Sequence, residues 1–269
     1  NGSSDQDGSF SNPFSTIVQA LKSANSSDTL KLKPGTYDEN YFDMGINGIS
    51  GNNNSGELSN LESITIIGVD GPDQTILNAN FNSRIFRFQD MRSVSLSGLT
   101  LTKGTSPTPG GAINVQFVDT LKVSNVIFDL NTVGNSMGDR GNAYGGAVAI
   151  SNVSHSIFRD VSFNNNFLNS QFHDEIIGGG AVQIWNNSPD KPHSNAIFEN
   201  CSFYGNGLTS SFDNNYATGA AVNISSGVEL KFMNTRFEYN YIDVRDGSNS
   251  SGDGVILSCL LYTSDAADD

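Results

Sequence analysis

Ionisable side chains that could act as acids, bases or cation ligands gather in three short segments of this sequence. The segments contain Asp139 and Arg140; His173, Asp174 and Glu175; and Asp190, Lys191 and His193. Carboxylates with Lys or Arg could hold a cation and remove a proton in a lyase, and paired carboxylates could supply the acid and base of a hydrolase. Acidic loops are common on protein surfaces, and the spacing here matches no acid and base pair. A catalytic role and ordinary loop charge therefore both stay open.

Metal and thiol chemistry have little support in the sequence. Residues 246–254, DGSNSSGDG, lack the alternating ligands and the terminal Glu of a calcium loop, so we expect a solvated loop. Cys201 falls in an apolar column, where we expect a small buried hydrophobe rather than a reactive thiol. We predict no catalytic residue, no metal site and no cofactor.

The elements that position these segments repeat along the chain. An apolar strand ending in Phe-x-x-Asn is followed by a variable segment and then by a Gly/Ala-rich turn that opens a second apolar strand. The Phe and Asn pairs are Phe128 and Asn131, Phe163 and Asn166, Phe203 and Asn206, and Phe237 and Asn240. The turns are GGAI at 110–113, GGAV at 145–148, GGAV at 179–182 and GAAV at 219–222. Such self-similarity is typical of stacked units that bury their apolar faces only against neighbours.

Aligned copies predict side-chain ladders. Period-two alternation gives one column of Ile66, Leu96, Val123, Phe158, Phe198 and Phe232, and another of Leu101, Phe128, Phe163, Phe203 and Phe237. Between the columns stand Gly68, Gly98, Asn125, Asp160, Asn200 and Asn234, residue types that tolerate positive φ, so we expect a corner there. We predict an all-β, right-handed parallel β-helix with three sheet faces, whose segments 132–143, 167–178 and 207–218 leave the body as loops.

The chain ends fit one domain, 1–258. Residues 14–24 carry apolar residues at helical spacing after Asn12 and Pro13, which predicts a short helix capping coils that run from 28 to 257. Residues 259–269, CLLYTSDAADD, break the repeat and resemble a translated sequencing adapter, so we expect a non-native tail. We also expect the chain to be a segment of a longer protein.

The repeats resemble those of the polymorphic outer-membrane proteins over roughly 93–257. That resemblance implies a surface-displayed β-helical passenger domain with a part in adhesion. The opening NPFSTIVQALKSANSSDTLKLKPGTY is similar to the first segment of pectin-lyase-like domains, which implies the fold rather than a reaction.

Enzymes of that fold act on the outer face of the strand after the Gly/Ala turn, and the residues expected there are neutral. They are Ala112, Asn114, Gln116, Ala147, Ala149, Ser151, Ala181, Gln183, Trp185, Ala221, Asn223 and Ser225. An exposed Trp185 could stack on a sugar while Gln183, Asn114 and Asn223 bond its hydroxyls. The alternative is that Trp185 packs beneath the next loop.

The acidic composition limits the classes of binding partner that we expect for this chain. The net charge of -14 and a pI near 4.4 repel phosphate backbones and anionic lipid, so we expect no nucleic acid partner and no membrane insertion in this segment. We predict a monomeric, non-catalytic segment of an extracellular or cell-surface protein for adhesion, display or contact with a polysaccharide or host glycan. The alternative is a carbohydrate-active enzyme, a polysaccharide lyase or glycoside hydrolase, that is truncated or uses the loop charges.

Overall fold

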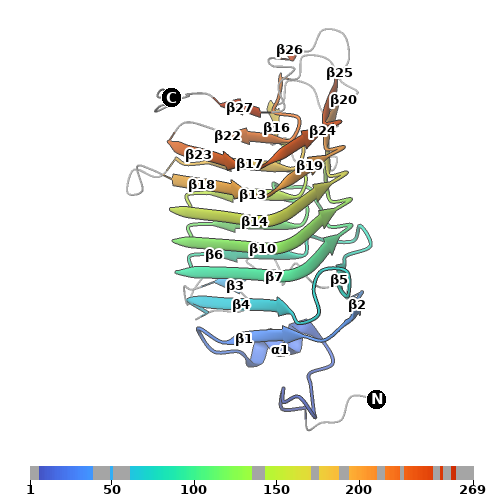
Figure 1. The fold of residues 1–269 in the computed structure, drawn as a ribbon, viewed down its shortest axis with the longest axis vertical. Helices are drawn as coiled ribbons and strands as arrows, with labels where there is room; N and C mark the ends of the chain where they lie inside the picture. Colours follow the sequence, from blue (N-terminus) through green and yellow to red (C-terminus); the bar gives the residue numbers. More distant parts are fainter. Residues whose placement is uncertain are drawn as a thin grey trace.

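Parallel strands stacked coil upon coil form nearly all of the structure (Figure 1). The computed structural model describes residues 6–38, 49–50, 61–134, 143–170, 176–187, 194–210, 216–224, 227–244, 249–250 and 256–258. Within these residues the strands form four parallel sheets, an arrangement consistent with a β-helix.

The largest sheet, the long sheet, has eleven strands in the described chain. Its main path is β1 (Thr29–Leu32), β4 (Ser63–Gly68), β7 (Ser93–Thr102), β10 (Thr120–Asp129), β14 (His155–Asn164), β18 (Ser194–Glu199) and β23 (Val228–Met233), joined by β2 (Gly35–Tyr37), β5 (Thr75–Asn78), β19 (Ser202–Tyr204) and β24 (Arg236–Glu238). The seven-stranded sheet contains β3 (Ile49–Ser50), β6 (Phe86–Gln89), β9 (Ile113–Gln116), β13 (Val148–Ser151), β17 (Val182–Trp185), β22 (Val222–Ile224) and β27 (Ile256–Ser258).

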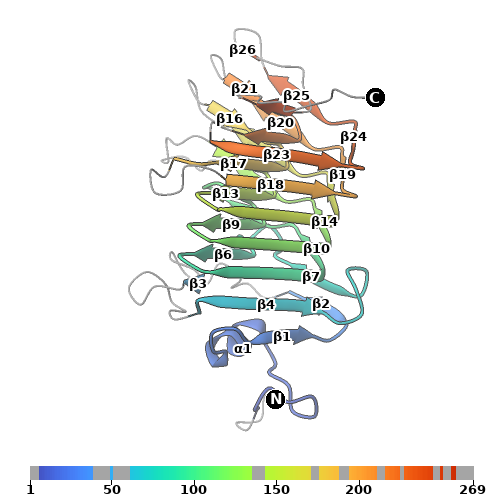
Figure 2. The same cartoon turned by 60° about the vertical axis from the view of Figure 1, so that its left-hand side comes forward.

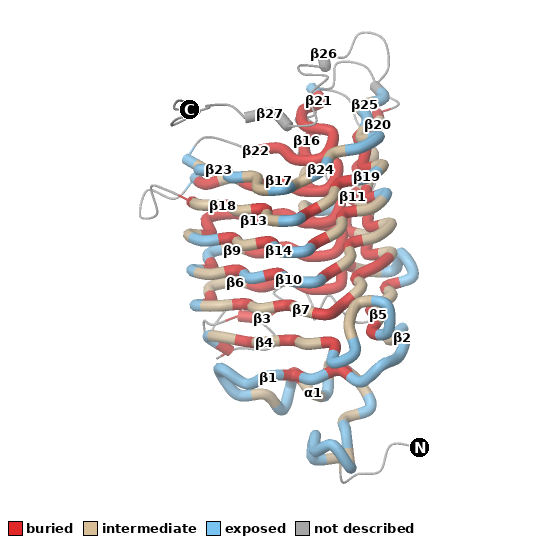
Figure 3. Tube along the Cα trace, in the orientation of Figure 1, coloured by how far each residue is buried: buried red, intermediate tan, exposed pale blue. Residues whose placement is uncertain are grey.

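The predicted ladders of the core are confirmed. Phe158 is in register with Val123 and Phe198, and Phe163 with Phe128 and Phe203. The ring of Phe163 stacks on Phe128 at 5.0 Å and on Phe203 at 4.6 Å between centroids, with interplanar angles of 6° and 3°. Side chains from the long sheet and the seven-stranded sheet fill the main core, which appears as the buried stripes of Figure 3.

The predicted corner is confirmed at Gly98, Asn125, Asp160, Asn200 and Asn234, whose φ values lie between 47° and 65°. Each corner residue of β7, β10 and β14 bends a ten-residue strand in its middle. Gly68 differs: its φ is outside the left-handed region, and a Cβ there would lie 2.0 Å from the Gly98 carbonyl oxygen.

The segments expected as loops contain strands instead. The five-stranded sheet is β8 (Thr105–Ser106), β11 (Thr132–Gly134), β15 (Phe167–Ser170), β20 (Gly207–Ser210) and β25 (Tyr241–Val244); the four-stranded sheet is β12 (Ala143–Tyr144), β16 (Ile176–Gly178), β21 (Tyr216–Thr218) and β26 (Asn249–Ser250). They enclose a second core of Val133, Leu168, Leu208, Ala143, Ile177 and Ala217. From β11 and β12 onward, the coils therefore carry an arm that runs out along one sheet and returns along the other, seen around β20, β21 and β25 in Figure 2.

The predicted N-terminal helix is present but shorter. α1 spans Ile17–Ser23, and Thr16 rather than Asn12 is its N-cap, because the Thr16 hydroxyl accepts a hydrogen bond from the Gln19 N–H at 3.1 Å. Ile17 and Leu21 are buried in the main core beside Leu30 of β1. Figure 1 shows α1 next to β1 at the N-terminal end of the stack. No helix among the described residues has the length and apolar character that crossing a bilayer requires.

Candidate functional site

The outer face of the seven-stranded sheet is mostly covered, so the exposure expected for it is wrong. Ala147 and Ala149 are fully buried, and Gln183, Asn114 and Asn223 are only 2%, 3% and 8% exposed. Ala149, Gln183 and Asn223 do alternate with core residues such as Val148 and Val182, as expected from the period of two. The outward direction predicted for Ala112, Ala147, Ala181 and Ala221 is wrong, because all four belong to the main core, whereas Ala149 lies outside that core and is still closed to solvent.

The returning strand β16 accounts for the burial of Gln183 and Asn223. A Cβ on Gly178, the last residue of β16, would lie 2.3 Å from Asn223 Nδ2 and 2.9 Å from Gln183 Oε1, so the β16 backbone rests on both amides. The Gly/Ala turn brings the arm this close: Gly179 has a φ of 69°, and a Cβ on Gly180 would lie 2.0 Å from the Ala220 carbonyl oxygen.

The buried amides bond to the protein rather than to solvent. Asn223 Nδ2 donates to Gln183 Oε1 at 2.7 Å, and Asn114 Nδ2 donates to the Pro109 carbonyl at 2.8 Å. Gln183 Nε2 lies 3.4 Å from the Ile184 carbonyl. Their geometry suits a structural role beneath the arm better than contact with sugar hydroxyls.

Trp185 is different, since it is half-exposed at the end of β17. Its ring lies 5.9 Å from the ring of Tyr144 at 44°, so an aromatic neighbour from β12 supports it on one side. In the register of the sheet, Trp185 continues a row of Ser151, Gln116 and Gln89, of which the two glutamines are half-exposed. In this row, which we call the tryptophan ribbon, Trp185, Gln116 and Gln89 are partly accessible, while Ser151 between Trp185 and Gln116 is buried.

Sequence reasoning missed three residues beside the ribbon. Tyr144 immediately precedes a Gly-Gly turn, and Phe117 follows Gln116 with a φ of 53° and is exposed. Arg87 on β6 is in register with Asn114, and its Nη2 donates to Gln89 Oε1 at 3.1 Å. The β6 coil lacks the Gly/Ala turn, so the alignment of turns passed over it, although the alternation of Phe86 and Phe88 points to Arg87 as outward.

The ionisable segments named from the sequence lie outside the described residues. These are Asp139, Arg140, His173, Asp174, Glu175, Asp190, Lys191 and His193, together with Ser225, most of 246–254 and the tail 259–269. In the part of the chain that is described, no three His, Cys, Asp or Glu side chains lie together as a metal site.

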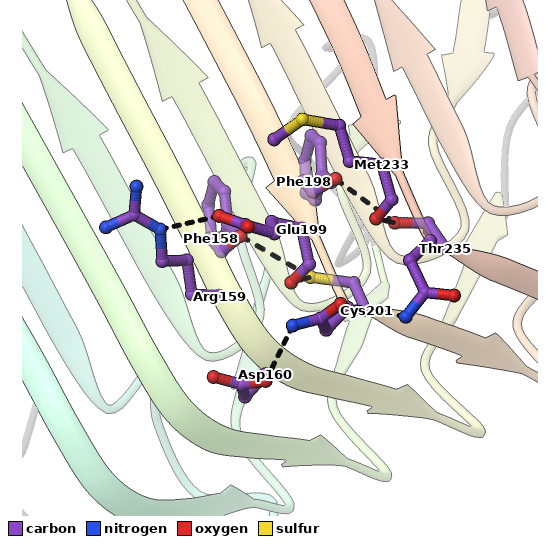
Figure 4. Close-up of polar contacts among 10 residues, drawn as sticks. Phe158, Arg159, Asp160, Phe198, Glu199, Cys201, Met233 and Thr235 are labelled. Atoms are coloured by element: carbon purple, nitrogen blue, oxygen red, sulfur yellow. Dashed lines mark hydrogen bonds and ion pairs between the residues drawn. The ribbon is translucent and has the colours of Figure 1, made fainter.

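Cys201 occupies the buried column position expected for it. Its thiol lies 3.4 Å from the Glu199 carbonyl and 3.6 Å from that of Phe158, and burial raises its pKa to about 11 (Figure 4). Thr235 repeats the pattern one coil later, donating to the Met233 and Phe198 carbonyls at 3.1 Å. A thiol held this way is a poor nucleophile, because the thiolate is the reactive form.

Comparison with known proteins gives a partial match to one curated protein. The chain matches no family model. Over 101 residues, 38% of this chain, it is 28% identical to YwoF of Bacillus subtilis (strain 168), itself described as uncharacterized. The matched stretch is 20% of the length of YwoF.

Proposed function

We propose that this chain is a non-catalytic β-helical segment of a larger extracellular or cell-surface protein, serving adhesion, display or glycan contact. The observation that carries the proposal is the character of the outer face of the seven-stranded sheet. Where an enzyme of this architecture would need ionisable groups open to substrate, four successive strands carry the neutral, buried side chains of Asn114, Ala149, Gln183 and Asn223. Acid and base catalysis requires groups within hydrogen-bond reach of the substrate.

The proposed fold is a right-handed solenoid with three faces, of the pectin-lyase-like class. Support comes from the corner at Gly98, Asn125 and Asp160, which divides the long sheet into two faces, while the seven-stranded sheet supplies the third. The likeness of the repeats to surface passenger domains supports placement outside the cell. The excess of acidic residues disfavours nucleic acid as a partner.

Glycan contact would take place on the tryptophan ribbon. The half-exposed indole could stack on one sugar ring while Gln116 and Gln89 bond neighbouring hydroxyls. Glycan-array binding of the chain and of Trp185→Ala tests this. We expect bound glycans to be lost in Trp185→Ala and retained in Trp185→Phe, whereas unchanged binding by Trp185→Ala would remove the ribbon from the proposal.

The alternative function is a carbohydrate-active enzyme, and Arg87 is the observation in its favour. This cation stands on the same outer face as Asn114. Incubation with acidic polysaccharides, with and without calcium, followed by absorbance of unsaturated products and a reducing-sugar assay, separates the two functions. We expect no product. Steady release that Arg87→Ala or Asp174→Ala abolishes, and that the exposed-site control Lys122→Ala leaves intact, would establish the enzyme instead.

A further inference from the structure

Three exposed tyrosines lie where the long sheet turns into the five-stranded sheet, at the last coils of the described stack. Tyr204 ends β19, Tyr239 follows β24, and Tyr241 begins β25. Their exposed fractions are 46%, 79% and 46%. Both Figure 1 and Figure 2 show β19 and β24 beside β20 and β25 at this edge. We call the three residues the tyrosine corner; gathered exposed aromatic rings mark binding sites more often than isolated ones do.

Tyr204 and Tyr239 form a fixed pair. Their ring centroids are 5.3 Å apart and the rings meet edge to face at 71°. Tyr239 has a φ of 56°, and its counterparts in earlier coils, Leu130 and Asn165, have similar values of 54° and 51°. The fold therefore imposes this backbone geometry at each coil, and Tyr239 holds a large ring in solvent from a rigid position.

Tyr241 lies flat on a glycine. A Cβ on Gly207 would lie 2.4 to 2.7 Å from three atoms of the Tyr241 ring, Cζ, Cε1 and Cε2, so one face of the ring rests on the Gly207 backbone. Gly207 is in register with Tyr241 on one side and with Phe167 on the other. Because almost half of Tyr241 is exposed while one ring face is covered, the opposite face is turned to solvent.

Polar groups suited to sugar hydroxyls surround the rings. Asn164 is in register with Tyr204, and on the neighbouring strands Thr209 Oγ1 donates to Asn169 Oδ1 at 3.3 Å. Two exposed carboxylates, Glu238 and Asp243, stand in register with Tyr204 and Thr209. Amides and hydroxyls beside open ring faces fit a carbohydrate, and the carboxylates would repel uronate or sulfate groups.

We propose that the tyrosine corner binds an uncharged polysaccharide, with Tyr241 and Tyr239 stacking on sugar rings. The inference rests on the proposed glycan contact but places a second site away from the tryptophan ribbon. A ring that lies flat and fixed before binding loses little conformational freedom, which favours stacking.

Affinity electrophoresis in native gels tests the site, with laminarin, galactomannan or hydroxyethyl cellulose as the neutral probes, and polygalacturonate and chitosan as the charged ones. We expect retardation in a neutral gel, and a loss of affinity of about fivefold to tenfold in both Tyr239→Ala and Tyr241→Ala. Tyr241→Phe should bind within about twofold of the original chain, since stacking needs the ring. Gly207→Ala should weaken binding while keeping every aromatic residue, because its Cβ displaces the Tyr241 ring.

Phe81→Ala is the matched control, because Phe81 is an aromatic residue of similar exposure, 47%, that lies outside the tyrosine corner. No retardation by any neutral probe, or equal binding by the Tyr→Ala variants, would overturn the inference. Retardation by chitosan alone that salt abolishes would mean charge attraction. Self-association that is seen by sedimentation and lost in Tyr239→Ala would mean that the tyrosine corner binds a second copy of the chain rather than a polysaccharide. If Trp185→Ala alone removes binding, the proposed function stands and the tyrosine corner does not.

Discussion

Replacing Asn166 with Ala tests the role of the asparagines that end each Phe-x-x-Asn repeat. Asn166 is fully buried, and its side chain makes four hydrogen bonds of 3.0 Å. Oδ1 accepts from the backbone N–H and the Nδ2 of Asn131, and Nδ2 donates to the Phe128 carbonyl and to Asn206 Oδ1. The asparagines thus form a continuous ladder through successive coils, with Asn131 below and Asn206 and Asn240 above.

The expected cost follows from these bonds. A net contribution of roughly 1 kcal/mol for each of the four gives a loss of about 4 kcal/mol in the free energy of unfolding, and the groups left unpaired in the interior keep the loss from being smaller. Asn169→Ala is the matched control three residues away, since Asn169 is half-exposed and accepts one bond of 3.3 Å from Thr209. We expect it to cost less than about 1 kcal/mol.

Urea unfolding followed by circular dichroism and by the fluorescence of Trp185, the single Trp, measures both variants. A loss below about 1 kcal/mol in Asn166→Ala, or one no larger than in Asn169→Ala, would refute the ladder as a stabilising device. Asn240→Ala should fall between the two, because Asn240 makes three comparable bonds but is only half-buried.

Substitutions at three further positions test the core, the thiol and the positive-φ corner of the long sheet. Phe163→Ala removes a ring stacked on both sides and should cost about 3 to 5 kcal/mol in urea unfolding, with Phe163→Leu clearly milder; near-equal losses would contradict the stack. Burial raises the pKa of the Cys201 thiol from 9.0 to about 11. The protonated thiol therefore contributes to the free energy of unfolding fully below about pH 9. This contribution is lost as the pH rises towards 11, because the thiol ionises first in the unfolded chain and then in the folded one. Unfolding measured across that range should show this loss for the original chain and not for Cys201→Thr; parallel curves would contradict it. Asn125 has a φ of 51°, so Asn125→Gly should leave the free energy of unfolding nearly unchanged and Asn125→Val should lower it by about 1 to 2 kcal/mol. Equal losses in the two variants would contradict the role of positive φ at this corner.

The main core could be predicted because the repeat places like residues on like. Once Phe158 is aligned with Phe198, the parallel register and the inward direction of every second residue follow from the strand period. The corner was predictable for a similar reason, since Asn125 and Asp160 are among the few non-glycine types that adopt positive φ readily. These inferences depend on local chemistry repeated at each coil.

The arms were missed because their strands are only two to four residues long and contribute at most one residue each to the second core among the described side chains. A signal was present, however. Val133, Leu168, Leu208 and Ile242 each stand two residues after the Asn of a repeat, and all four pack in the second core. A single apolar residue per coil has no periodicity within its own strand, so it becomes informative only when the copies are compared.

The burial of the outer face of the seven-stranded sheet limits where a ligand could reach the protein. Because β16 rests on Gln183 and Asn223, these two amides in the middle of the seven-stranded sheet are buried. Accessible aromatic rings lie at two margins of the stack in particular coils: Trp185, which is partly exposed, at the end of the seven-stranded sheet, and Tyr239, which is exposed, beside the arm. Residues with positive φ, such as Asn152 and Tyr239, occupy the turn at each margin. Residues in these turns lie outside the strand pairing that aligns the neighbouring side chains. Substitutions at these margins can therefore change binding with little effect on the ladders that hold the coils together.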